Sequence, residues 1–77
     1  MDKITEMQKK MYYSRGHNVK VGLVGTNKAL IGKCVYFTQP LDNDPEMASI
    51  DVIVKESGKE VLYELFEEDI ESIETVD

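Results

Sequence analysis

The sequence predicts a mainly β protein, in which an N-terminal α-helix precedes a small antiparallel barrel of about five short strands. Three observations lead to this class. The chain has 77 residues, enough for a single domain with a thin core. Its apolar residues repeat first with a helical period and then with a period of two. Residues typical of turns separate the alternating stretches, so the strands must curl around one shared core.

The helix is expected over residues 3–13. Its apolar stripe has i, i+3, i+7 spacing and consists of Ile4, Met7 and Met11. We expect Asp2 to cap the first turn and Arg15 with Gly16 to end the helix. The stripe is interpreted as the surface that covers one end of the barrel.

The barrel is expected over residues 17–76. Alternation at 19–23 predicts the first strand, and a glycine-containing loop at 25–28 follows it. Residues 29–38 are apolar on both faces and include Gly32, which indicates a bent or bulged strand. The remaining expected elements are a loop at 41–46, a strand at 50–54, a turn at 57–59, a strand at 61–65 and a tight turn at 67–70. A short last strand is expected to start at Ile73 or to be centred on it, and to end near Val76.

Charge is unevenly distributed along the chain. Nine Lys and Arg against fifteen Asp and Glu give a net charge of −6, so the whole molecule should repel nucleic acids and acidic membranes. Residues 1–39 hold seven cations and two acids, a net charge of +5, whereas residues 40–77 hold two cations and thirteen acids, a net charge of −11. A basic face and an acidic face are therefore both candidates for binding.

Cysteine and histidine usage limits the chemistry that is expected. The single cysteine, Cys34, cannot form an intrachain disulfide and is interpreted as a small buried apolar side chain. With one histidine, His17, it leaves too few ligands for a zinc site within one chain. A fold without disulfides fits a reducing, cytoplasmic compartment. No apolar run approaches the roughly 18 residues of a membrane helix, so no membrane contact is expected.

Two further patterns are candidates for chemical sites. Acidic residues at 42, 44 and 46 have the spacing of a calcium loop, but Met47 and Ile53 stand where such a loop needs Gly and Glu. A nucleophile with a base could be assembled from Ser14, His17 and Cys34, but no third group orders them. We therefore expect a protein without catalytic residues, metal or cofactor.

The order of elements resembles the Sm-like (LSm) fold, a strongly bent SH3-like barrel preceded by a helix. The motif positions of that family fall on Gly32, Phe37, Leu41, Asp42 and Asn43. In RNA-binding members an Asn binds a base and an Arg-Gly pair covers it. Here Asp42 stands at the Asn position with Asn43 one residue late, and Phe66 and Glu67 replace the Arg-Gly pair. A carboxylate cannot donate to a base and repels phosphate, so the family's RNA pocket is expected to be absent.

Two functional hypotheses follow. The first is a binding or regulatory module, such as a phage-type inhibitor, whose acidic face meets a basic protein partner. That face comprises Glu64, Glu67, Glu68, Asp69 and Glu71. The alternative is a divergent Sm-like protein that binds RNA or nucleotides through its basic half, where aromatic and basic residues are interleaved. Its candidate residues are Lys9, Lys10, Arg15, His17, Lys20, Lys28, Lys33 and Tyr36. Self-association through paired sheet edges is compatible with both.

Overall fold

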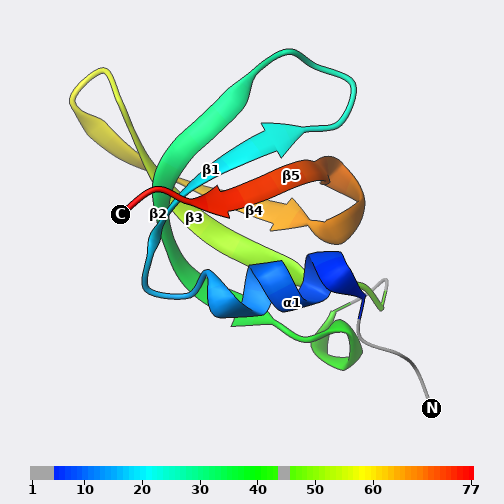
Figure 1. Ribbon diagram of the computed structural model, residues 1–77. Helices are drawn as coiled ribbons and strands as arrows, with labels where there is room; N and C mark the ends of the chain where they lie inside the picture. Colours follow the sequence, from blue (N-terminus) through cyan, green and yellow to red (C-terminus); the bar gives the residue numbers. More distant parts are fainter. Residues whose placement is uncertain (1–4, 44–45) are drawn as a thin grey trace.

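The computed structural model describes residues 5–43 and 46–77, so the predictions for Asp2, for Ile4 and for the acidic residue at 44 lie outside the described residues. A helix and five antiparallel strands confirm the mainly β class (Figure 1). The elements are α1 (Glu6–Tyr13), β1 (Asn18–Leu23), β2 (Ala29–Thr38), the 3-10 turn η1 (Pro40–Asp42), β3 (Ser49–Glu56), β4 (Lys59–Phe66), the 3-10 turn η2 (Glu67–Asp69) and β5 (Ile70–Thr75).

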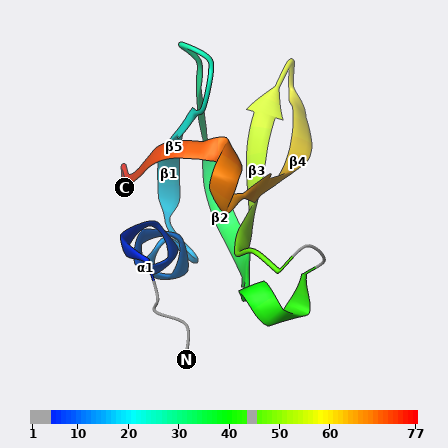
Figure 2. The ribbon, with the colours of Figure 1, turned by 90° about the vertical axis from the view of Figure 1, so that its right-hand side faces the viewer.

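The strands form one bent sheet in the order β4-β3-β2-β1-β5. β1 to β4 follow one another as a meander, and β5 returns to pair with β1. β4 and β5 are the two edges of this sheet, so hydrogen bonding does not close it, although its curvature is compatible with an SH3-like barrel. The 3-10 turn η2 joins the two edge strands and directs β5 to the free side of β1 (Figure 2).

The core lies on the concave side of the sheet, beneath α1. It is built from one helix residue, from residues of all five strands and from Ala48 just before β3. The buried apolar residues of β1 and β3 alternate, as the period of two predicts, whereas Ile70 and Ile73 of β5 are three positions apart. The buried apolar residues are Met11, Val19, Val21, Cys34, Ala48, Ile50, Val52, Val54, Leu65, Ile70 and Ile73. Burial of Cys34 and Met11 confirms the interpretation of both as core side chains.

β2 has the bounds that the sequence predicts and is both bent and bulged. The register with β3 shifts between Cys34 and Tyr36, so the bulge is at Val35. Gly32 serves a different purpose, because a Cβ atom there would lie 2.2 Å from the carbonyl oxygen of Ile53. The bend therefore depends on backbone contact that only glycine permits.

α1 begins at Glu6 instead of residue 3, because Thr5 is extended and serves as its N-cap. The hydroxyl of Thr5 accepts from the backbone N–H of Gln8 at 3.0 Å, and the Gln8 side chain accepts from the backbone N–H of Thr5 at 3.2 Å. This capping box satisfies two donors of the first turn, which explains the correction. The expected end is confirmed, since Gly16 takes a left-handed conformation with φ +79°.

The last strand is centred near Ile73, which is one of the two expected placements. β5 starts at Ile70, which pairs with Leu23 of β1 and has a buried side chain, so the tight turn expected at 67–70 ends at Asp69. α1 and η1 lie at one end of the sheet, whereas the β1–β2 loop and the β3–β4 hairpin project from the opposite end (Figures 1 and 2). The molecule therefore offers two well-separated surfaces.

Candidate functional site

A groove of about 420 Å³ lies between α1 and the segment that joins β2 to η1. Its walls are mainly aromatic and apolar. The lining residues are Gln8, Lys9, Tyr12, Tyr13, Phe37, Gln39 and Pro40. The groove is the largest concentration of exposed aromatic rings among the described residues. It is the candidate functional site.

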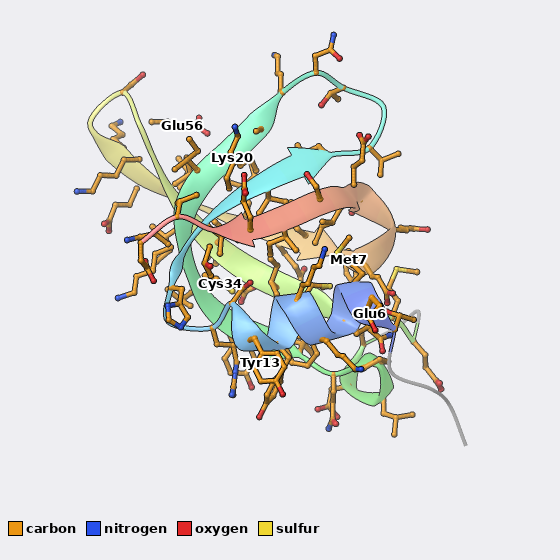
Figure 3. The ribbon with its side chains drawn as sticks, viewed as in Figure 1. Glu6, Met7, Tyr13, Lys20, Cys34 and Glu56 are labelled. Atoms are coloured by element: carbon orange, nitrogen blue, oxygen red, sulfur yellow. The ribbon has the colours of Figure 1, made fainter. Side chains whose placement is uncertain are left out.

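Helix geometry places two tyrosines on the surface. Met11 is fully buried, and Tyr12 and Tyr13 follow it at roughly 100° and 200° around the helix axis, outside the buried stripe. Tyr12 is 43 % exposed and Tyr13 is 72 % exposed. Figure 3 shows Tyr13 projecting from α1 away from the sheet. The rings therefore cannot both enter the core.

Edge-to-face contacts hold the aromatic rings in place. The ring of Tyr12 lies 5.5 Å from that of Phe37 at an interplanar angle of 89°. It also lies 5.5 Å from the ring of Tyr13 at 78°. Such arrangements are the preferred geometry of aromatic pairs. Because Phe37 also packs against the core, the groove wall is anchored to the sheet.

The groove has a cationic rim. The guanidinium of Arg15 lies 3.9 Å from the centroid of the Tyr12 ring, and its Nε donates to the carbonyl oxygen of Tyr12 at 3.1 Å. Lys9 lines the groove itself and lies 3.7 Å from the Glu6 carboxylate. Both members of that pair are exposed, so water screens their attraction. The rim is therefore able to attract an anionic group.

The three other positions expected to match the Sm-like motif lie just after the groove residues Gln39 and Pro40. Leu41 is 75 % exposed on η1. Asp42 accepts from Nε2 of Gln39 at 3.0 Å. The Asn43 amide donates to the carbonyl oxygen of Met47 at 2.7 Å and to Oγ of Ser49 at 3.0 Å. Both amide hydrogens of Asn43 are thus used within the protein, where they fix the segment that leads into β3.

One carboxylate of the predicted acidic face holds α1 in position. Glu67 accepts from the hydroxyl of Thr5 and from Nε2 of Gln8, both at 2.8 Å. This negative charge also lies at the positive end of the helix dipole. The clamp ties the N-terminus of α1 to η2, and Glu67 is therefore a structural residue.

The remaining acidic candidates are divided among three elements. Asp69 caps η2, since its side chain accepts from the backbone N–H of Phe66 at 3.3 Å. Glu68 is exposed on η2, and Glu71 is exposed on β5. Glu64 lies on the outer face of β4, opposite Asp51 of β3. The acidic face is consequently smaller and less continuous than the sequence predicts.

The basic candidates are dispersed as well. Lys9 and Arg15 reach the groove, whereas Lys10 lies on the side of α1 that faces β5. The others stand away from it: Lys28 in the β1–β2 loop, and Lys20, Lys33 and Tyr36 on the outer face of β1 and β2. His17 pairs through Nδ1 with the carboxylate of Asp77.

The side chains considered as a nucleophile and a base, Ser14, His17 and Cys34, do not form a catalytic arrangement with one another. Ser14 donates its hydroxyl to the carbonyl oxygen of Lys10 at 2.6 Å, and His17 is paired with Asp77. Burial raises the pKa of the Cys34 thiol, which favours its protonated form. The backbone N–H of Asn18 and the ring of His17 lower the pKa of Asp77. No three potential metal ligands meet within residues 5–43 and 46–77.

No model of a known protein family, no curated protein and no solved structure matches the chain. In the part of the chain that the structure describes, no helix is long and apolar enough to cross a membrane.

The sequence indicates only part of the groove. Phe37 is a position of the resemblance motif, and Tyr12 and Tyr13 belong to the stretch in which aromatic and basic residues are interleaved. Gln39 and Pro40 were missed, because their approach to α1 depends on the tertiary fold. The available signal was the position of both tyrosines outside the apolar helix stripe.

Proposed function

We propose that the protein is a non-enzymatic binding module that docks a segment of another protein in the groove between α1 and η1. The exposed aromatic groove carries this proposal. Interfaces are enriched in Tyr and Phe, and their strongest contacts are aromatic anchors in pockets. Tyr12, Tyr13 and Phe37 supply such anchors in a preorganised arrangement.

The chemistry of the groove favours an extended partner segment with an apolar or proline anchor and a neighbouring acidic residue. The walls are mainly apolar, Lys9 is the charged residue among those that line the groove, and the Arg15 guanidinium lies over the Tyr12 ring. An acidic residue beside the anchor would complement this rim and would speed association. The groove is therefore a better docking surface than the acidic face, because Glu67 and Asp69 of that face already hold hydrogen bonds within the protein.

A protein segment is favoured over RNA for two reasons. The net charge of −6 opposes a polyanion. The basic residues are spread over α1, the β1–β2 loop and the outer sheet face, so they do not follow one groove as single-stranded nucleic acid requires. We further propose that the chain is a divergent Sm-like barrel, supported by its order of a helix and five bent strands.

Selection of random peptides on the immobilised protein tests the docking proposal. We expect enriched peptides to combine an apolar or proline anchor with Asp or Glu. Their affinity should fall at least tenfold for Tyr13→Ala, as for an aromatic anchor, and stay unchanged for Tyr36→Ala. Tyr36 is a matched control, because its side chain is 60 % exposed, close to the 72 % of Tyr13, and lies on a different face.

Three outcomes would contradict the proposal. The first is enrichment of peptides without an acidic residue, and the second is normal binding of the selected peptides to the Tyr13→Ala variant. Alternatively, a uridine-rich oligonucleotide could bind the groove more tightly than any selected peptide, with the salt dependence of phosphate contacts. Chemical shifts of the backbone amides of α1 and η1 would locate either ligand.

A further inference from the structure

Arg15 lies just beyond the C-terminus of α1, and its two neighbours in the chain fix its backbone. Ser14 is buried, and its hydroxyl donates to the carbonyl oxygen of Lys10 at 2.6 Å. The backbone N–H of Gly16 donates to the carbonyl oxygen of Cys34 on β2 at 2.7 Å. The backbone of Arg15 therefore has a defined position beside the groove, although its side chain is exposed.

Two contacts also fix the guanidinium group of Arg15. Its Cζ lies 3.9 Å from the centroid of the Tyr12 ring, and its Nε donates to the carbonyl oxygen of Tyr12 at 3.1 Å. These contacts use one face of the group and one of its five N–H donors. The two terminal nitrogens carry the other four donors, and no hydrogen bond or ion pair uses them within residues 5–43 and 46–77. The side chain is therefore held in place with its terminal nitrogens free for a ligand.

The two cations of the groove rim differ in what they can recognise. The terminal nitrogens of an arginine form a planar fork that matches the two oxygens of a carboxylate. Lys9 is a compact charge on a flexible stem, and the Glu6 carboxylate already lies 3.7 Å from its Nζ. Of these two cations, Arg15 is therefore the one that can fix the orientation of a carboxylate.

We propose that Arg15 determines the specificity of the groove by binding a side-chain carboxylate of the docked segment through both terminal nitrogens, an inference that rests on the proposed docking function. A phosphate group fits less well, because phosphopeptide recognition uses clusters of arginines and the net charge of −6 repels a dianion. The terminal carboxylate of a partner chain also fits less well. Its capture uses backbone N–H groups, whereas the C-terminal end of α1 presents carbonyl oxygens.

Calorimetric titration with the most enriched peptide of the selection tests this role. Arg15→Lys keeps the charge but loses the fork, so we expect binding to weaken about tenfold. Lys9→Gln should weaken binding less than about threefold, because its charge is exposed and paired. Lys28→Gln is the control for the loss of one positive charge, since Lys28 lies in the β1–β2 loop at the opposite end of the molecule (Figure 1). Circular dichroism checks that each variant is folded.

A change in the peptide supplies the second half of the test. Replacing its acidic residue with the corresponding amide should weaken binding about tenfold on the parent protein and hardly at all on Arg15→Lys, because the two changes remove the same contact. On the parent protein, the side-chain NMR signals of Arg15 should shift with the acidic peptide and not with its amide form.

The outcomes separate this inference from the docking proposal. Equal losses for Arg15→Lys and Lys9→Gln, tighter binding of a phosphoserine peptide, or loss of binding when the peptide's C-terminus is amidated would each overturn the role of Arg15. If Tyr13→Ala still abolished binding in those cases, the docking proposal would stand. A selection that enriches no peptide would refute both.

Discussion

Replacing Gly32 with alanine should destabilise the fold, although alanine in a strand is normally better than glycine by about 0.5–1 kcal/mol. The added Cβ atom would lie 2.2 Å from the carbonyl oxygen of Ile53 and 3.0 Å from Cγ1 of Val52. Because the first obstacle is backbone, β2 and β3 must separate. We expect a cost of about 3 kcal/mol, the upper end of overpacking effects.

This loss can be measured against a matched glycine. For a domain of this size, about 3 kcal/mol lowers Tm by roughly 12–24 °C. Gly22 also lies in a strand, but a Cβ atom there would meet Oγ of Ser72 at 2.6 Å, and that hydroxyl can rotate away. Gly22→Ala should therefore change stability by less than about 1 kcal/mol. Thermal and urea unfolding followed by circular dichroism would refute the reasoning if Gly32→Ala melted within a few degrees of the parent protein.

Three further outcomes are expected. Glu67→Ala should lower the free energy of unfolding in urea by about 1–2 kcal/mol, as the loss of a helix cap does. Glu68→Ala is the control and should change this free energy by less than about 0.5 kcal/mol, so equal effects of the two substitutions would exclude the clamp. The pKa of Asp77 is lowered in the folded state, so its ionised carboxylate should stabilise the fold above the ordinary pKa of 3.8, and this stabilisation should disappear as pH falls below that value. Asp77→Asn should therefore lower the free energy of unfolding near neutral pH and leave it unchanged in acid. Iodoacetamide should alkylate the buried Cys34 far more slowly in the native protein than in denaturant; similar rates would contradict its burial.

The elements that depend on neighbouring residues could be predicted well. The bounds of β2 are correct because apolar residues end at the same points as turn residues begin. The turn at residues 57–59 is confirmed by Ser57 and Gly58, which both have positive φ. The cap of α1 could also have been found, since Thr5 and Gln8 have the spacing of a capping box.

The parts that depend on distant residues could not be predicted. Thr5 and Glu67 are separated by 62 positions, so the pattern of residues 64–71 indicates only an acidic surface. The same limit applies to the groove, where Pro40 reaches α1 only after β2 has bent. The charge runs and the aromatic residues therefore indicate which kinds of side chain are present on the surface. Which of those side chains contact one another depends on the tertiary fold.

The return of β5 to β1 has a consequence for how the chain folds during synthesis. The meander from β1 to β4 pairs each strand with the one made just before it, so these hairpins are able to form as the chain leaves the ribosome. The second partner of β1 and the hydrogen-bond partner of Thr5 at the start of α1, in contrast, are made last, because they are β5 with Ile73 and the η2 residue Glu67. Until then the nascent chain presents an unpaired strand edge beside apolar side chains, a state prone to aggregation. Loop closure by β5 is therefore the expected slow step, and translation speed sets how long that edge stays open.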